Sequence, residues 1–229
     1  MSGTFFSKSL QTQALQMAQG RSSDFHHEWV LRILQSEGLP LEASVLDFGA
    51  GQGFLIRALK NHGLMNLMGA DLLPAPAEIN SPWKQADLNS FPSQEFSQKF
   101  DWVIGVEVIE HLENPRNTLR QMAQMIKPGG KILLTTPNVE SWRSFLSFML
   151  RGHFVDFLDS SYPAHITPII RMDLERIIKE CGLEIRSVQY SDRGVLPFFT
   201  KWTWQKISAR ILKGKRFSDH ILLVARKVK

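Results

Sequence analysis

The sequence predicts an α/β fold in which a mostly parallel β-sheet carries helices on both faces. Residues 45–48 form a short apolar run interrupted only by Asp47, and they pass directly into Gly49-Ala50-Gly51-Gln52-Gly53, a turn typical of a strand that leads into a helix. Residues 102–106 are apolar throughout, as expected of a strand buried on both faces. A helical segment then separates this strand from the next one, which favours parallel strands.

The other elements follow in order along the chain. The predicted helices cover residues 11–38, 115–126 and 171–180, besides the helix that follows the glycine turn. The predicted strands cover residues 45–48, 64–70, 102–106, 131–136, 183–190 and 220–227, and residues 83–86 form a short stretch closed by Asp87. Asn114 and Pro115 predict an N-cap with proline in the first helical turn, and Gly182 ends the last helix.

Length and composition predict a single domain over residues 1–229. A chain of 229 residues with 43% hydrophobic content can bury one sizeable core. We expect a cytoplasmic protein, because no uninterrupted apolar stretch has membrane-spanning length and the first residues lack the pattern of a signal peptide. Cys181 is the only cysteine, and we expect it to be a small core residue rather than a nucleophile.

Three segments lie outside this regular pattern. Residues 1–40 predict a helical cover ahead of the sheet, and residues 138–167 predict an irregular, strongly aromatic and aliphatic segment that could form a substrate lid. Residues 193–217 predict a basic, aromatic insertion before the last strand. The stretch from 193 to 229 has a net charge of +9, whereas the rest of the chain has −4. Such a basic stretch suits nucleic acid, an anionic membrane surface or a phosphorylated substrate, and is equally typical of a solvated face.

The glycine turn predicts a ligand site. Glycine lets a ligand approach the backbone where a Cβ atom would block it, and the following helix begins with N–H groups that suit anionic or hydroxyl-rich ligands. The third glycine comes one residue too early for the dinucleotide fingerprint G-x-G-x-x-G. Asp71 follows the second strand, where an α/β nucleotide site places an acid on the ribose hydroxyls. The pattern therefore indicates a nucleotide-type cofactor.

With these signals in this order, residues 44–183 resemble the class I S-adenosylmethionine (SAM) dependent methyltransferases. The resemblance implies a Rossmann-like methyltransferase fold with a seven-stranded, mostly parallel sheet, with SAM as cofactor and S-adenosylhomocysteine as product. It implies contacts from the glycine turn to the methionine part of SAM, from Asp71 to the ribose and from Asp87 to the adenine. The cofactor-binding residues are then Asp47, Gly49, Ala50, Gly51, Asp71, Leu72, Asp87, Leu88 and Glu107. From the residues alone, Asp47 could instead fix the turn and Asp87 could cap one.

The acceptor side is predicted from Glu107, Glu110 and His111, because side chains at the carboxyl ends of parallel strands face the ligand crevice. Together with His165 they resemble two metal-assisted groups: the ubiquinone-biosynthesis O-methyltransferases and the enzymes that methylate the terminal ribose of small RNAs. In those groups, acids and histidines at these positions hold a divalent cation. We expect no metal here, and assign catalysis to Glu107, His111 and His165, with a histidine as general base. His165 could alternatively anchor a loop.

The resulting expectation is a SAM-dependent transfer of a methyl group to a hydroxyl of a small-molecule, glycan or lipid-linked acceptor, with peripheral contact to a membrane surface. The apolar lid disfavours nucleic acid as a partner, and the cysteine and Asn-Pro-Pro-Tyr arrangements of nucleobase methyltransferases do not occur. Two alternatives stay open. One is an RNA ribose 2'-O-methyltransferase that uses the basic tail. The other is a non-catalytic, SAM-binding subunit with a closed acceptor pocket.

Overall fold

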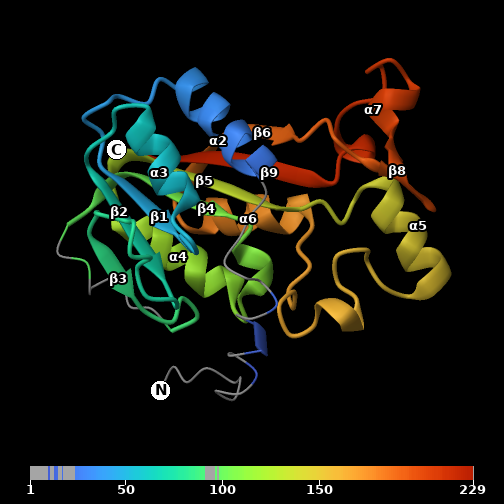
Figure 1. Cartoon of the computed structure of the whole chain (residues 1–229), viewed down its shortest axis with the longest axis horizontal. Helices are drawn as coiled ribbons and strands as arrows, with labels where there is room; N and C mark the ends of the chain where they lie inside the picture. Colours follow the sequence, from blue (N-terminus) through green and yellow to red (C-terminus); the bar gives the residue numbers. More distant parts are fainter. Residues whose placement is uncertain are drawn as a thin grey trace.

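The computed structural model describes residues 24–90, 96 and 98–228, together with Leu10, Gln13, Ala14 and Met17. Seven strands form one sheet in the order β3-β2-β1-β4-β5-β9-β6 (Figure 1). They are β1 (Val45–Phe48), β2 (Leu67–Asp71), β3 (Trp83–Gln85), β4 (Phe100–Val106), β5 (Ile126–Pro137), β6 (Leu183–Tyr190) and β9 (His220–Lys227). Only β9 runs against its neighbours, β5 and β6. The predicted seven-stranded, mostly parallel sheet is therefore confirmed.

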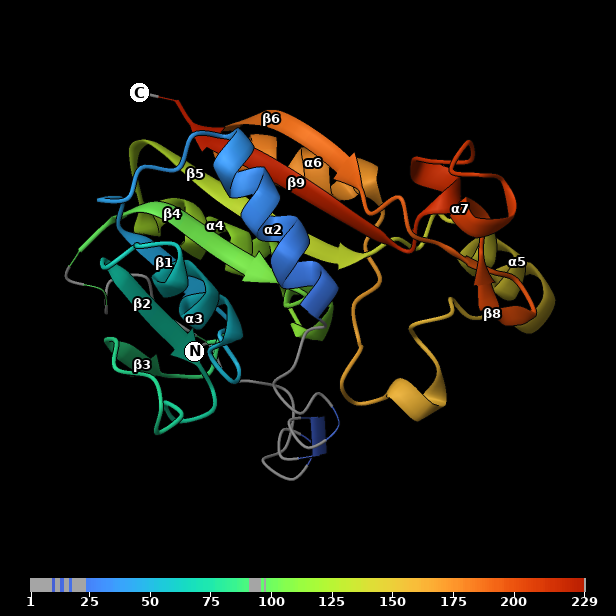
Figure 2. The same ribbon diagram turned by 45° about the horizontal axis from the view of Figure 1, so that its top comes forward.

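Helices cover both faces of the sheet (Figure 2). The helices α2 (Asp24–Ser36) and α3 (Phe54–Asn61) pack on one face, and α4 (Pro115–Met125) and α6 (Arg171–Glu180) pack on the other. Successive strand residues alternate between the two cores, so Ile104 packs toward α2 and α3, whereas its neighbour Val103 packs toward α4 and α6. Because the central strands are buried on both sides, they read as continuous apolar runs.

Local signals located several elements closely. The observed α6, β6 and β9 have the predicted bounds, and the Asn114 side chain caps α4 by accepting a 3.0 Å hydrogen bond from the Asn117 N–H. The second strand begins at Leu67, later than predicted. Strand β5 begins earlier than predicted, because residues 127–130 belong to an irregular stretch of the strand. Cys181 is half-buried against the core beside α6, where burial raises the pKa of its thiol.

The prediction of an irregular segment at 138–167 is wrong for its first part, which contains the helix α5 (Trp142–Arg151). The Ser141 side chain caps this helix, and Gly152 ends it in a left-handed conformation. The basic insertion contains the hairpin β7 (Val195–Leu196) and β8 (Phe199–Thr203), followed by the short helix α7 (Trp204–Ile207). Most of the predicted cover ahead of Asp24 lies outside the described residues. None of the described helices has the length and apolar character to cross a membrane.

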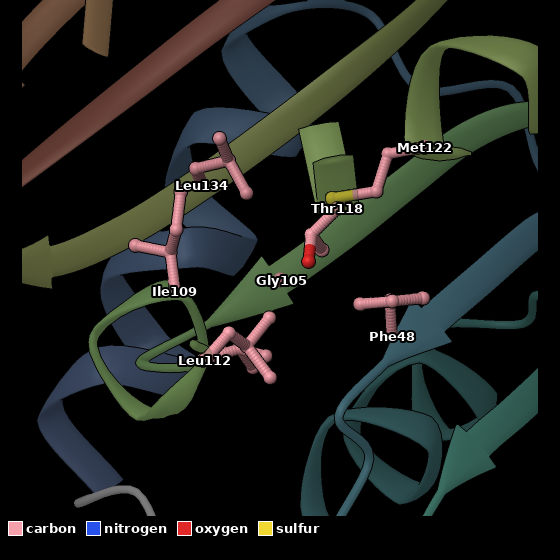
Figure 3. Close-up of a pocket in the computed structure, with 8 residues that line it drawn as sticks. Phe48, Gly105, Ile109, Leu112, Thr118, Met122 and Leu134 are labelled. Atoms are coloured by element: carbon pink, nitrogen blue, oxygen red, sulfur yellow. The ribbon is translucent and has the colours of Figure 1, made fainter. Parts of the chain in front are cut away.

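A small cavity of about 10 Å³ lies between the sheet and α4 (Figure 3). Its lining is apolar apart from a threonine: Phe48, Gly105, Val108, Ile109, Leu112, Thr118, Met122 and Leu134. The Thr118 hydroxyl is already used, because it donates to the Asn114 carbonyl oxygen at 3.2 Å. The cavity is therefore a packing void of the core rather than a site for a polar ligand.

Candidate functional site

The glycine turn between β1 and α3 is shaped by the end of β2. The N–H groups of Gly49 and Ala50 both donate to the carbonyl oxygen of Ala70, at 2.8 and 3.1 Å. The Gly51 N–H donates to Oδ2 of Asp71 at 2.7 Å, and the Leu73 N–H donates to Oδ1 of the same carboxylate at 2.8 Å. Asp71 thus joins the turn to the loop after β2, and each of its oxygens keeps a further lone pair for a ligand.

Two buried acids face each other at this turn. Burial raises the pKa of Asp47 to about 8, and the nearby charge of Asp71 adds to the rise. Burial also raises the pKa of Asp71, although its backbone N–H donors oppose the shift. The two carboxyl groups therefore resist ionising together, and a ligand that brings positive charge or hydroxyl donors to this edge would relieve their repulsion.

The glycine turn also abuts the segment that follows β4. Gly49 has a φ of +85°, and a Cβ atom added there would lie 2.4 Å from Cγ2 of Val108. Replacing Gly49 with Ala is expected to lower the free energy of unfolding by about 3 kcal/mol, through backbone strain and the clash together. Gly152→Ala is the matched control, since Gly152 has a φ of +79° and no neighbour within 4 Å of an added Cβ. Urea denaturation checks this, and equal losses in both variants would contradict the clash.

The loop after β3 carries the two residues predicted for the adenine. Asp87 Oδ1 accepts a 2.9 Å hydrogen bond from the Asn89 N–H, which is the capping contact that the residues alone allowed. Leu88 is half-buried against the core. Asn89 Oδ1 in turn accepts a 2.7 Å hydrogen bond from the Glu113 N–H, so this loop is tied to the segment after β4. Leu72 lies beside Asp71, and its carbonyl oxygen accepts from the Gln85 side chain.

Glu107 ends β4 in a left-handed conformation, with a φ of +53°. Its Oε2 lies 3.1 Å from Nδ1 of His220, and its Oε1 lies 3.9 Å from Nε2 of His26. Burial opposes charge on Glu107, but His220 and His26 outweigh it and lower the pKa of Glu107 to about 2. Burial also opposes charge on His220, yet Glu107 outweighs it and raises the pKa of that imidazole. Glu107 and His220 therefore form a half-buried ion pair.

Sequence reasoning missed both histidine partners of Glu107. His220 begins β9, and β9 runs antiparallel to β5, so this first residue lies at the carboxyl edge of the parallel strands. The sequence predicted the strand at 220–227, but placing His220 at this edge also requires knowing that the strand runs antiparallel to its neighbours. His26 lies in α2 and packs edge-on against His220, with ring centroids 4.3 Å apart.

A second group joins Glu110, His111 and His165, whose ligand atoms lie within 4.8 Å of one another. His111 Nδ1 lies 2.7 Å from the Ala164 carbonyl oxygen, and His165 Nδ1 lies 2.8 Å from that of Asp156. Because a carbonyl oxygen only accepts hydrogen bonds, Nδ1 carries a proton in both rings, and the neutral form of either ring has its lone pair on Nε2.

Glu110 is fully buried beside these rings. Its Oε2 accepts a 3.1 Å hydrogen bond from the Thr136 hydroxyl. Its Oε1 lies 3.9 Å from Nε2 of His111 and has no hydrogen-bond partner within the described part of the chain. Burial raises the pKa of Glu110, and the charge of Glu107 adds to the rise. Burial lowers the pKa of His111, and His165 lowers it further, so His111 is neutral near pH 7.

The structure thus brings together three of the four residues predicted as ligands of an optional cation. Glu107 is the exception, because its left-handed backbone turns the carboxylate toward His220 and His26. The edge consequently has two neighbouring groups of different character. One is an anionic carboxylate paired with histidine, and the other is a pair of imidazole rings beside a carboxyl group that resists ionisation.

The burial of His26 predicts a pH dependence of stability. Burial lowers its pKa from 6.5 to about 4. Between these values the unfolded chain binds a proton that the folded chain does not, so stability is lost as the pH falls through this window. At pH 5 the loss from this group is expected to be about 2 kcal/mol. Urea denaturation at pH 7.5 and 5 should show it for the wild type and not for His26→Gln. Parallel losses in the two proteins would contradict the assignment.

Comparisons with known proteins place this site in a family. The family model described as "Methyltransferase domain" matches residues 18–188. Ubiquinone biosynthesis O-methyltransferase of Saccharophagus degradans is 32% identical over 157 residues, which cover 64% of this chain and 66% of the relative. The mitochondrial enzyme of the same name from Dictyostelium discoideum is 28% identical over 165 residues, covering 64% of this chain and 49% of the relative.

A solved structure shows the same fold with a ligand. The N-methyltransferase NodS of Bradyrhizobium japonicum, in complex with S-adenosylhomocysteine, matches with a TM-score of 0.59 and 17% identity, over 97% of this chain and 100% of that chain. The chain spans about half to two thirds of the length of the curated relatives it matches. The family match includes the glycine turn, Asp71 and the segment from Glu107 to His111. The chain therefore belongs to the class I SAM-dependent methyltransferases.

Proposed function

We propose that this protein transfers the methyl group of SAM to a hydroxyl of an apolar acceptor, either a small molecule or a lipid-linked one. The observation that carries the proposal is the pair His111 and His165, each with Nδ1 held by a carbonyl oxygen, at the strand edge that carries the glycine turn. The names of the relatives, ubiquinone biosynthesis O-methyltransferases, support oxygen as the accepting atom.

In this proposal the cofactor turn orients SAM, which supplies an activated methyl group. Asp71 accepts hydrogen bonds from the ribose hydroxyls with its remaining lone pairs, and Leu72, Asp87 and Leu88 border the adenine. Glu107 stays ionised because its pKa is low, so it can pair with the ammonium of the methionine part. Asp47 sits beneath the turn and holds its shape.

On the acceptor side, His111 is the general base. Its Nε2 would take the proton of the acceptor hydroxyl, and SAM would supply the methyl group from its sulfonium, which would become a neutral thioether. A neutral imidazole suits this step, and the lowered pKa of His111 keeps it neutral near pH 7. His165 lies edge-on to His111, with ring centroids 4.8 Å apart, and helps to orient the acceptor against the ring of Phe157.

The residues present also fit a divalent cation. Glu110 offers a buried oxygen without a hydrogen-bond partner among the described residues, and two imidazole nitrogens lie within reach of it. One carboxylate with two imidazoles suits Zn²⁺ or Mn²⁺ better than Mg²⁺, which prefers oxygen ligands. A bound cation would lower the pKa of the acceptor hydroxyl. Glu110, His111 and His165 would then be its ligands, and His111 would no longer be the base.

The test is methyl transfer from SAM labelled in the methyl group, offered with a prenylated dihydroxybenzene, the same ring without its chain, or an RNA oligonucleotide. Label on the prenylated ring oxygen supports the proposal, and label on the RNA alone would replace it with ribose methylation. Saturable SAM binding without transfer to any of these would favour the non-catalytic subunit. Repeating the assay after chelation, with and without added Zn²⁺ or Mn²⁺, separates the base mechanism from the metal one.

A further inference from the structure

One end of the molecule exposes an unusual amount of apolar side chain. In Figures 1 and 2, α5, β8 and α7 lie together at this end, away from β1, β2 and β3. Segment 198–211 exposes Phe198, Phe199, Trp202, Ile207 and Ile211, each to more than half of its surface. On α5, the side chains of Phe148, Met149 and Leu150 are also exposed. We call these eight residues the apolar end.

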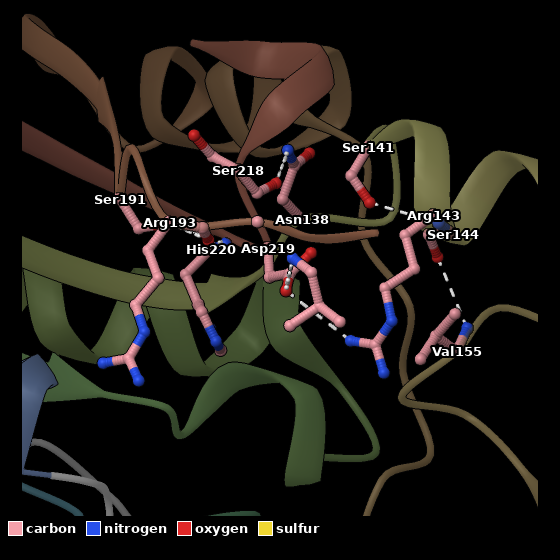
Figure 4. A network of polar contacts seen from close by, with 12 residues as sticks. Asn138, Ser141, Arg143, Ser144, Val155, Ser191, Arg193, Ser218, Asp219 and His220 are labelled. Carbon is pink, nitrogen blue, oxygen red and sulfur yellow. Dashed lines mark hydrogen bonds and ion pairs between the residues drawn. The ribbon is translucent and has the colours of Figure 1, made fainter. Parts of the chain in front are cut away.

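The two halves of the apolar end are joined to each other and to the sheet. Arg151 of α5 lies over the ring of Phe198, 5.9 Å from its centroid. The Asn138 side chain, directly after β5, donates to the carbonyl oxygens of Lys215 and Ser218, and Arg143 lies 3.5 Å from Asp219 (Figure 4). These contacts fix the apolar end beside the strand edge that carries the candidate site.

The turn of the β7–β8 hairpin contains a residue in a strained backbone conformation. Pro197 and Phe198 form the turn between β7 and β8, and Phe198 has a φ of +66°. That conformation favours glycine, and a bulky residue in it is strained. A phenylalanine that is both strained and 67% exposed contributes little to folding, which points to a role outside the folded chain itself.

The basic side chains around the apolar end indicate an anionic partner. Residues 193–217 contain seven basic and no acidic side chains, and α5 contains Arg143 and Arg151 without an acid. We propose that the apolar end binds the surface of an anionic lipid bilayer, with its aromatic and aliphatic side chains among the lipids and the basic groups on the head groups. The proposal concerns where the protein docks, and it holds whether or not the acceptor is the one proposed above.

Two other occupants fit less well. A second copy of the chain would bring the same basic surface against itself in a two-fold dimer, where the like charges repel. An RNA would be attracted by the charge and could stack on the aromatic rings, but half of the apolar end is aliphatic and offers no stacking surface for bases: Met149, Leu150, Ile207 and Ile211. A bilayer surface accommodates aliphatic and aromatic side chains alike.

The test is flotation of the full chain with vesicles of phosphatidylcholine, with and without phosphatidylglycerol. We expect flotation with the anionic vesicles and roughly tenfold weaker partitioning for Phe198→Gly, because this variant loses the transfer of a phenylalanine side chain from water into the lipid. Glycine relieves the positive φ, so this variant should keep or raise the melting temperature. Met65→Ser is the matched control: Met65 is 81% exposed and precedes β2, which lies away from the apolar end.

Several results would overturn the proposal. These are no flotation with anionic vesicles, equal flotation of wild type and Phe198→Gly, or an equal loss in Met65→Ser. A dimer in sedimentation analysis that Phe198→Gly dissociates would assign the apolar end to self-association instead. Binding of an RNA oligonucleotide that needs Phe198, without flotation, would assign it to nucleic acid.

Discussion

Replacing His111 with Ala is expected to reduce methyl transfer by roughly 100- to 10,000-fold, the range that a positioned general base supplies. The effect should lie in kcat, because His111 belongs to the acceptor side, whereas the cofactor turn is formed by other residues. S-adenosylhomocysteine affinity should therefore stay close to that of the wild type. The measurement combines steady-state kinetics with labelled SAM and calorimetric titration of the product cofactor.

The control for this variant is Thr118→Ala. Thr118 is buried and lines the packing void between the sheet and α4, and its hydroxyl donates to the carbonyl oxygen of Asn114 at the start of that helix. It should keep its kcat. Loss of cofactor affinity in His111→Ala would show that this histidine serves the SAM side, and an unchanged kcat would rule it out as base or ligand.

Replacing Asp71 with Ala is expected to lower the affinity for S-adenosylhomocysteine by roughly 100-fold or more. A hydrogen bond to a charged group contributes about 1.5–3 kcal/mol, and in the proposed site Asp71 accepts from both ribose hydroxyls. The substitution also leaves the N–H groups of Gly51 and Leu73 without their acceptor, at 2.7 and 2.8 Å in the wild type, so the turn itself should loosen. Calorimetric titration measures the affinity, and urea denaturation measures the accompanying loss of stability.

Asp101→Ala is a matched control for the stability loss. Asp101 also accepts a backbone hydrogen bond, from the Ser44 N–H at 2.8 Å, but it lies near the amino end of β4, away from the strand edge with the site. The Asp101→Ala variant should be less stable than the wild type, while its affinity for S-adenosylhomocysteine stays unchanged. If the Asp71 and Asp101 variants lost affinity alike, the loss would reflect general destabilisation rather than a contact with the ribose.

Sequence patterns located the parts of the fold whose signals are local. The helix α6 and the strands β6 and β9 combine apolar spacing with clear ends such as Gly182, and the cap at Asn114 is confirmed by its hydrogen bond. Helix α5 was missed because its aromatic residues were interpreted as a loose lid. Trp142, Phe145, Leu146 and Met149 in fact have helical spacing, and Arg143, Ser147 and Arg151 form a polar stripe on the other side of the helix, so the signal was present in the sequence and was overlooked.

Part of the site was predictable, because several of its residues lie where the parallel strands end. Glu110, His111 and His165 meet as expected, although His165 comes from a distant loop. The pairing of Glu107 with His220 was not predictable, because it depends on the direction of β9 and on a left-handed φ at Glu107. The roles assigned to individual residues in binding SAM and in catalysis stay predictions.

The measurement that tests the account most directly is calorimetric titration of the chain of residues 1–229 with S-adenosylhomocysteine. The account predicts saturable binding with one molecule per chain, at the glycine turn between β1 and α3, and a steep loss of affinity in Asp71→Ala. An absence of binding to the wild type would contradict the cofactor site, and the proposed methyl transfer would fall with it.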